Sequence, residues 1–244
     1  VSVNGITLTG ADAGNYTLSG TTATTAADIT VRPLSTWIGG ASGNWSVASN
    51  WDALPDLSNV LAVSVPAGNV TYDAAAGSTN LTSLTAAGLS IAGGSLNIAN
   101  SMTVSSSFSQ SGGVLGLGGG ASASITQASG NLNVPALTVA NLSLAAPVGA
   151  ITQSGMIVAV ALNTQSQTGT TLDNTGNRIS SFSAANSGSG DVVLSNTAAL
   201  TISDAGIINN GGNIVIDNTG AVTTVGPVRA PNGVLIGITA HSPL

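Results

Sequence analysis

The chain has 244 residues but only three Arg and no Lys, nine Asp and no Glu, so its formal net charge is −6. Nucleic-acid binding is excluded, because neutralising phosphates needs clustered Lys or Arg. Long amphipathic helices are excluded as well, because their solvent faces draw on Glu, Lys and Arg. Abundant Gly, Ser, Thr and Asn, with Val, Ile and Leu at short intervals, predict an all-β fold with frequent turns.

The absence of cysteine fits a protein exported across a bacterial envelope without disulfides. Membrane insertion is not expected, because a spanning helix needs about 20 predominantly apolar residues. The longest apolar run covers only residues 155–162. No leader-like segment begins at Val1, so we expect either that a leader has been removed or that this is a segment of a longer chain.

Residues 1–33 contain stretches of alternating apolar and polar residues separated by Gly, Asp and Asn, which predicts about three short β-strands. So few strands bury too little apolar surface to fold alone. We therefore expect an incomplete small β domain, or one completed by a neighbouring chain or segment. The apolar residues expected to make these assembly contacts are Val3, Ile6, Leu8, Tyr16, Leu18, Ile29 and Val31.

The three tryptophans of the chain, Trp37, Trp45 and Trp51, all fall within residues 34–59 among Gly, Ser and Asn. Indole rings could form a platform for sugar rings, or they could cover an apolar surface at the end of a fold. We favour the second interpretation, because a stack of β-coils needs a cap over its first core layer. Residues 34–59 are therefore predicted to form a cap and linker.

From residue 60 onward, pairs of apolar residues recur at short intervals and are separated by Gly or Asn turns. This pattern predicts three short strands per coil in a right-handed parallel β-helix that covers residues 60–244. The expected core pairs include Val63 and Val65, Leu81 and Leu84, Leu89 and Ile91, Leu96 and Ile98, Met102 and Val104, Leu132 and Val134, Leu137 and Val139, and Leu142 and Leu144.

From residue 172 onward the tetrapeptides Leu-Asp-Asn-Thr, Leu-Ser-Asn-Thr and Ile-Asp-Asn-Thr follow one another at a constant interval. A strand-forming repeat of about 22 residues is typical of coils that stack directly on one another. The register places Leu194, Ile214 and Ile216 in inward-facing columns, and a further step reaches Ile236 and Ile238. We therefore predict roughly eight coils, with Ile236 and Ile238 as assembly contacts to a further coil.

The same repeat aligns Asn174, Asn196 and Asn218 in one column. These side chains could bind a ligand or a cation, but calcium would want several carboxylates. We favour an internal ladder in which each amide bonds to the coil above and below. The adjacent column of Thr could bind ice if a second regular Thr column accompanied it, and none is evident in the sequence.

Asp173 and Asp217 lie two repeats apart, which is about 9.6 Å along one column and is compatible with a pair of inverting carboxylates. We favour turn residues instead, because Asp is common at turns and Arg178 is the only nearby cation. His241 has no Ser-His-Asp arrangement around it in the sequence. The sequence therefore predicts no enzyme, no metal site and no cofactor.

The stretch Ala-Asp-Ala-Gly-Asn-Tyr-Thr-Leu at residues 11–18 resembles the signature of small β repeat domains in very large bacterial surface adhesins. The Trp-rich residues 43–55, with Gly-Asn-Trp-Ser, Asn-Trp and Pro, resemble the start of autotransporter-type β-helical passengers. The coils with Asn-Thr-Gly turns are similar to filamentous-haemagglutinin-type exoproteins of the two-partner secretion route. The resemblance implies a bacterial β-helical adhesin at the cell surface or in the extracellular space.

We therefore expect a non-enzymatic structural protein, namely a β-helical adhesin stalk or a filament subunit. Its expected partners are further copies of itself joined head to tail, or neighbouring repeats of the same chain, because an uncovered coil exposes unpaired backbone groups. Host or matrix glycans are further candidate partners. A β-helical protein that binds or cleaves polysaccharide is the alternative, and an ice-binding solenoid is less favoured.

Overall fold

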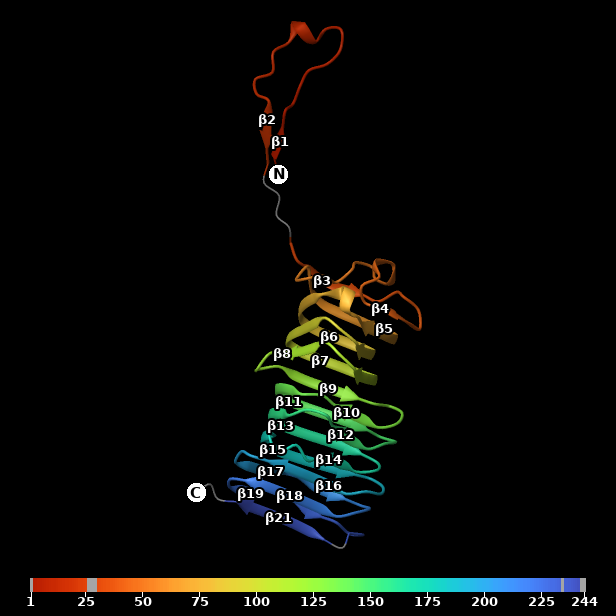
Figure 1. The fold of residues 1–244 in the computed structure, drawn as a ribbon, viewed down its shortest axis with the longest axis vertical. Coiled ribbons are helices and arrows are strands. Elements are labelled where there is room, and N and C mark those ends of the chain that lie inside the picture. The colour runs from red at the N-terminus through yellow and green to blue at the C-terminus, as the bar shows by residue number, and fades with distance from the viewer. Residues whose placement is uncertain (1, 26–29, 234, 242–244) are drawn as a thin grey trace. The chain divides into compact units, whose positions relative to one another are not determined.

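The computed structural model describes residues 2–25, 30–233 and 235–241. The chain divides into two compact units, Val1–Val31 and Arg32–Leu244, and each is described by itself. The first contains a small antiparallel sheet, and the second is a parallel β-helix of about nine coils (Figure 1). The predicted all-β class and parallel β-helix are thereby confirmed.

In the first unit, β1 (Ser2–Asn4) pairs antiparallel with β2 (Thr22–Thr24). The second of the three expected strands contains instead η1 (Ala13–Asn15), a single 3-10 turn, because its Gly, Asp and Asn residues favour turns. The third expected strand falls partly on residues 26–29, which lie outside the described residues. Its last two residues, 32 and 33, belong to β3, the first strand of the β-helix.

The β-helix is built on two parallel sheets. Among the described residues, the larger sheet follows the order β19-β17-β15-β13-β11-β9-β7-β6-β5-β3, and the smaller follows β10-β12-β14-β16-β18-β21. In the larger sheet β4, β8 and β20 pair with β5, β7 and β17. The strands are β3 (Arg32–Thr36), β4 (Ser42–Asn44), β5 (Val60–Tyr72), β6 (Ser78–Ile91), β7 (Ser95–Gln110), β8 (Val114–Leu117), β9 (Ser122–Thr126), β10 (Leu132–Val134), β11 (Leu137–Ala146), β12 (Ile151–Gln153), β13 (Ile157–Ser166), β14 (Thr170–Leu172), β15 (Arg178–Asn186), β16 (Val192–Asn196), β17 (Leu200–Asn209), β18 (Ile214–Thr219), β19 (Val222–Thr224), β20 (Val228–Arg229) and β21 (Ile236–His241).

Helical structure in the described part of the β-helix is limited to the single turns η2 (Ala48–Asn50) and η3 (Ala74–Ala76). Both are short connections, one within the Trp-rich segment and one between β5 and β6. Within residues 2–25, 30–233 and 235–241, no helix has the length and apolar character needed to cross a membrane.

Contacts between neighbouring coils give the length of each coil. At the junction of β18 with β21, the Leu235 N–H donates to Asn213 Oδ1, and the two residues are 22 apart in the sequence, as the repeat predicts. Before β12, the Ala150 N–H donates to Asn131 Oδ1, and these two residues are only 19 apart in the sequence. The predicted coil length was therefore too long for the middle of the β-helix. The variation in coil length falls in the turns and in bulges where the pairing register shifts, as between Phe182 and Ala184.

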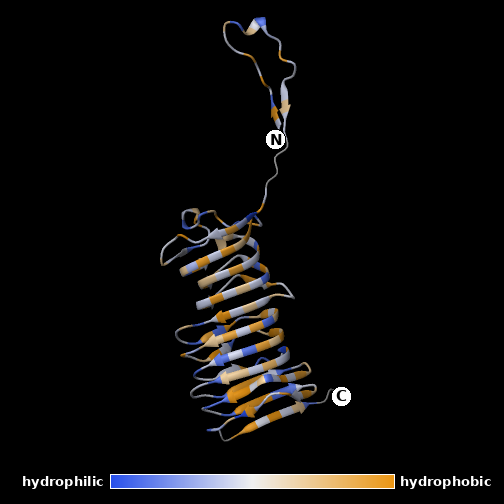
Figure 2. Ribbon diagram, turned by 180° about the vertical axis from the view of Figure 1, so that it is seen from behind, coloured by the Kyte–Doolittle hydropathy of each residue, from blue (hydrophilic) through white to orange (hydrophobic). Residues whose placement is uncertain are grey.

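Stacked aliphatic side chains fill the inside of the β-helix. All the core pairs predicted between Val63 and Leu144 are buried. Leu194, Ile214 and Ile216 are at most 1% exposed, which confirms the inward columns. Buried and exposed residues alternate along the strands, as the pleat requires, and Figure 2 shows hydrophobic residues recurring from coil to coil.

Candidate functional site

The N-terminal face of the β-helix is closed by the three tryptophans. Trp37, Trp45 and Trp51 are 4%, 0% and 4% exposed. Trp51 packs edge to face with both other indoles, at ring-centroid distances of 5.1 and 4.7 Å. The three indole N–H groups donate to the carbonyls of Gly40, Pro55 and Trp45. The rings therefore lie where a cap was predicted, and their burial leaves no open platform for a sugar ring.

Tyr72 extends the tryptophan cluster into the first core layer. Its ring lies 5.1 Å from that of Trp45, and its hydroxyl is 2.9 Å from Thr79 Oγ1 and 3.0 Å from the Ser95 carbonyl oxygen. Burial raises the pKa of Tyr72. The phenol therefore stays protonated in neutral solution and can donate a hydrogen bond to this buried layer.

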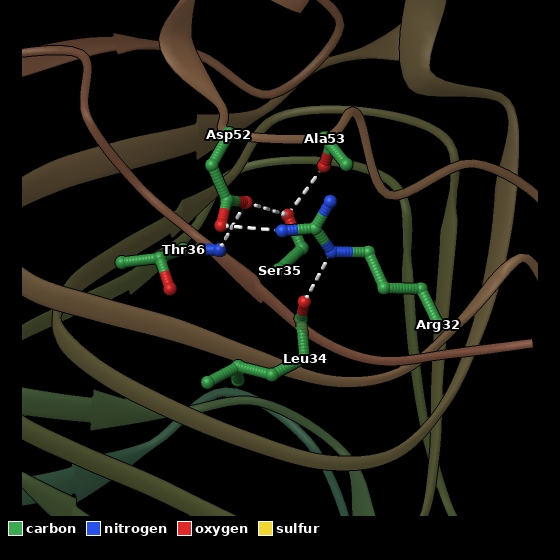
Figure 3. Close-up of polar contacts among 6 residues, drawn as sticks. All are labelled: Arg32, Leu34, Ser35, Thr36, Asp52 and Ala53. Carbon is green, nitrogen blue, oxygen red and sulfur yellow. Dashed lines mark hydrogen bonds and ion pairs between the residues drawn. The ribbon is translucent and has the colours of Figure 1, made fainter.

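The outer side of the edge strand β3 is covered by polar side chains (Figure 3). Asp52 Oδ1 accepts from the Thr36 N–H at 2.8 Å, and the Asp52 N–H donates to the Thr36 carbonyl at 3.1 Å. Arg32 Nη2 donates to Asp52 Oδ2 at 2.7 Å, and Arg32 Nε donates to the Leu34 carbonyl at 2.7 Å. Pro33, the residue between Arg32 and Leu34, has no backbone N–H that could donate a hydrogen bond. We call Arg32 and Asp52 the edge clasp.

The contacts of the edge clasp hold Asp52 as an anion. The hydrogen bond from the Thr36 N–H lowers the pKa of Asp52 most strongly, the charge of Arg32 and the Ser35 hydroxyl lower it further, and desolvation opposes them. Ser35 is buried, and its Oγ lies 3.3 Å from Asp52 Oδ1 and also bonds to the Ala53 carbonyl. The segment at Asp52 is thus attached to β3 through both backbone and side-chain groups.

The C-terminal face of the β-helix has no comparable cover among the described residues. β21 pairs with β18, and no described strand pairs with its other side. Ile236 and Ile238 lie in register with Ile214 and Ile216, which are 0% and 1% exposed. Nevertheless Ile236 and Ile238 are 47% and 38% exposed. The inward column therefore reaches this face as exposed aliphatic side chains.

Asparagine side chains link neighbouring coils inside the β-helix. Asn196 Nδ2 donates to Asn218 Oδ1 at 2.7 Å, and both residues are buried. Asn196 Oδ1 also accepts from the Ile179 N–H at 2.7 Å. Asn174 does not join this column, because it is partly exposed and its Oδ1 accepts from the Gly176 N–H in its own turn. Of the three predicted ladder residues, the structure brings two together.

Two further buried asparagine contacts were not anticipated from the sequence. Asn177 Oδ1 accepts from the Ile157 N–H at 2.9 Å, in the same manner as Asn196 does from its neighbour. Asn186 Nδ2 donates to Asn209 Oδ1 at 2.8 Å, across a separation of 23 residues. A search at the interval of the Asn-Thr repeat cannot pair Asn186 with Asn209, because their separation differs from that interval. The available signal was their common place at strand ends before Ser or Gly turns.

The apolar residues of the first unit that were predicted to make assembly contacts lie mainly at its surface. Their role in assembly stays a prediction. Val3, Leu8, Tyr16 and Val31 are exposed, Ile6 and Leu18 are partly buried, and Ile29 lies outside the described residues.

An acid and a base meet on the outer surface of β18 and β21. Asp217 Oδ1 lies 2.7 Å from His241 Nε2, and the two side chains are 59% and 56% exposed. With Ser195 they line a shallow pocket of about 240 Å³. In a catalytic triad the imidazole lies next to the serine hydroxyl. Here the register partner of Ser195 is Asp217, so a carboxylate takes the place of the imidazole. Asp173 is exposed and does not line this pocket, so the two carboxylates do not converge there.

A neutral groove of about 460 Å³ crosses the larger sheet from β7 to β17. Ser, Thr and Asn side chains supply most of its polar lining, and none of the lining residues carries a formal charge. Asn163 Nδ2 donates to Ser183 Oγ at 2.8 Å, and Asn141 Nδ2 donates to Ser122 Oγ at 3.3 Å. The groove therefore presents a mainly apolar surface with hydroxyl and amide groups along it.

The tryptophan cap was predicted from the sequence, but the edge clasp was not. Arg32 and Asp52 are 20 residues apart and belong to no repeat, so periodicity carries no information about their contact. The one available signal was that two of the few charged residues of the chain lie on either side of residues 37–51, which hold the three tryptophans.

Comparisons of the chain with models of protein families, with curated proteins and with solved structures found no match. The resemblance to bacterial adhesins therefore rests on the sequence motifs alone. What is shown is a β-helical protein with a closed N-terminal face.

Proposed function

We propose that the chain is a non-enzymatic structural protein of the bacterial cell surface, in which the β-helix is the stalk of an adhesin. The observation that carries the proposal is the uninterrupted stacking of coils, paired in parallel on two sheets around one aliphatic core. About nine coils at a strand spacing of about 4.8 Å form a rod roughly 40 Å long. Backbone hydrogen bonds between all neighbouring coils stiffen such a rod, as a spacer requires.

The contacts of the carboxylates support a structural role. Besides Asp52, Asp73 Oδ1 accepts from the Ser46 N–H at 3.2 Å, and Asp191 Oδ1 accepts from the Asn213 N–H at 2.7 Å. Each of these bonds fastens one segment of backbone to the next. Hydrolytic chemistry would instead need such groups to converge on one point where a substrate could sit.

The two faces of the β-helix favour a stalk that is extended in one direction. The capped face and the edge clasp oppose pairing of another strand with β3, whereas β21 offers an open edge and exposed aliphatic residues. The partner of the open face is accordingly a further β-coil with matching apolar columns. A neighbouring repeat of the same polypeptide and a second copy are the two sources of such a coil.

Antibodies raised against residues 32–244 test the proposed location when they are applied to intact and to permeabilised source cells. Labelling of intact cells is the expected result, and labelling confined to permeabilised cells would overturn it. The mass of the native protein then separates the two sources of the next coil. A mass near 23.4 kDa indicates a subunit, and a mass many times larger indicates a long adhesin.

The neutral groove favours a second candidate function, the binding of an uncharged polysaccharide. Its hydroxyl and amide groups match a hydroxyl-rich ligand, and without charges it offers nothing to a polyanion. Titration with neutral oligosaccharides, followed by calorimetry, tests this function. Asn163→Ala should weaken binding, while Asn133→Ala, an exposed residue outside the groove, should not. Equal affinities of both variants and the wild type would place any binding elsewhere.

A further inference from the structure

The larger sheet ends at β3, and the smaller sheet ends at β21. An edge strand presents unpaired N–H and C=O groups, which makes it a template for pairing with another chain. Copies of one β-helix carry both kinds of edge. Pairing of β21 in one copy with β3 in the next is a heterologous contact, and such a contact repeats into a filament wherever its rotation does not close a ring.

β21 is suited to such pairing. The Leu235 carbonyl accepts from the Ile214 N–H, and the His241 carbonyl accepts from the Gly220 N–H. Because backbone groups alternate in direction along a strand, the N–H and C=O groups of the even-numbered residues of β21 point away from β18. Ile236 and Ile238 add exposed aliphatic side chains at this edge.

β3 is closed to such pairing by the edge clasp. The Thr36 N–H and C=O, which point away from β5, both bond to Asp52. The Leu34 carbonyl is occupied by Arg32 Nε, and Pro33 supplies no donor. An incoming strand would have to displace a charge-assisted hydrogen bond and an ion pair before it formed its own bonds.

We propose that the edge clasp is a guard against strand addition: Arg32 and Asp52 keep β21 of a second copy from pairing with β3. The closed face thereby keeps β21 of one copy of residues 1–244 from adding to another copy head to tail. Pairing of two open faces remains allowed, and it ends at a dimer because such a contact is symmetric.

The test compares the wild-type chain with Asp52→Ala by sedimentation velocity over a hundredfold range of concentration. The wild type should reach a bounded mass, at most that of a dimer. Asp52→Ala removes the side-chain acceptor of the Thr36 N–H and the ion-pair partner of Arg32, while the Thr36 carbonyl keeps its bond to the backbone N–H of residue 52. The Thr36 N–H is then open to an incoming strand, and the mass of the variant should grow with concentration. Asp173→Ala is the matched control, because it removes one exposed carboxylate outside β3, and it should behave as the wild type.

A second change identifies the strand that pairs with β3. Ala240→Pro removes an N–H from the outer edge of β21 and leaves the bonds to β18 in place, because residue 240 points away from that strand. Combined with Asp52→Ala, it should return the mass to the bounded range. Arg32→Ala frees the Leu34 carbonyl alone and should cause weaker growth, which provides a test if Asp52→Ala does not fold.

Two results would overturn the proposal. One is a folded Asp52→Ala chain, with the wild-type circular dichroism spectrum, whose mass stays bounded at the highest concentration while Arg32→Ala behaves the same way. The other is a wild-type chain that itself grows without limit and shows hydrogen-exchange protection of both β3 and β21. Growth that survives Ala240→Pro would remove β21 from the mechanism.

Discussion

The two faces of the β-helix are built from the same kind of coil but end in opposite ways. At the N-terminal face three indoles cover the core and the edge clasp occupies the outer groups of β3. At the C-terminal face Ile238 lies in the same inward column as Ile216 but is 38% exposed rather than 1%. The difference teaches that a position in the repeat does not set burial by itself, because burial needs a coil on each side.

The same substitution in adjacent coils gives the sharpest version of this comparison. Ile216→Asp buries an unpaired charge and should lower the free energy of unfolding by about 4 kcal/mol. Ile238→Asp, one coil farther, should lower it by less than about 1 kcal/mol, because the carboxylate reaches water. Urea denaturation followed by circular dichroism measures both. Equal losses would mean that the C-terminal face is as covered as the core.

At the closed face, removal of one indole should open the cap. Trp45 is fully buried, packs against two aromatic rings and donates to the Pro55 carbonyl. Trp45→Ala should therefore cost about 3–5 kcal/mol of unfolding free energy. Val47→Ala in the same segment is the control, because Val47 is exposed. A loss below about 1 kcal/mol for Trp45→Ala, comparable to that of a surface change, would argue against the cap.

Between the two faces, substitution of a buried Asn of the repeat should lower stability more than substitution of a partly exposed one. Asn196→Ala leaves the buried Ile179 N–H without its acceptor and should cost about 1–3 kcal/mol. Asn174→Ala removes only a bond within a partly exposed turn and should stay within about 0.5 kcal/mol. Chemical denaturation gives both values, and faster hydrogen exchange at the Ile179 amide in Asn196→Ala identifies the cause. Equal costs for the two variants would show that the buried contact is not what matters.

Acid should weaken the edge clasp. The folded-state pKa of Asp52 lies below its ordinary value, chiefly because of the Thr36 N–H bond. Its contribution to stability is therefore present above the unfolded pKa of about 3.9 and is lost as pH falls through the lower folded pKa. Stability measured between about pH 5 and pH 2 should fall less steeply in Asp52→Asn. Identical profiles in the two proteins would contradict the effect.

The smallest effect is expected from the two carboxylates of the Asn-Thr repeat. The double variant Asp173→Asn, Asp217→Asn should stay within about 0.5 kcal/mol of the wild type, because both side chains are exposed. Its sedimentation should be unchanged as well. A polysaccharide-cleaving activity that is present in the wild type and absent from this variant would refute the structural role of these residues.

Much of the candidate site was within reach of the sequence because it follows from local composition. The clustering of all three tryptophans predicts a cap, and the regular interval of the repeat brings Asn196 to Asn218. The Asn186–Asn209 bond was out of reach, because a bulge in the pairing of β15 with β17 lengthens that separation to 23 residues. The pairing of Asp217 with His241 was missed for a related reason, since the two residues are 24 apart.

The sequence by itself determined the all-β class, the stacking of coils and the inward columns of Leu194 and Ile216. These features depend on which side chain occupies each pleated position, and that information is local and repeated. The tryptophan cap over the first core layer was also predicted, but only the tertiary structure decided which groups close the outer edge of β3. Arg32 and Asp52 belong to no sequence repeat, so their contact exists only once the segment that carries Asp52 has folded onto β3.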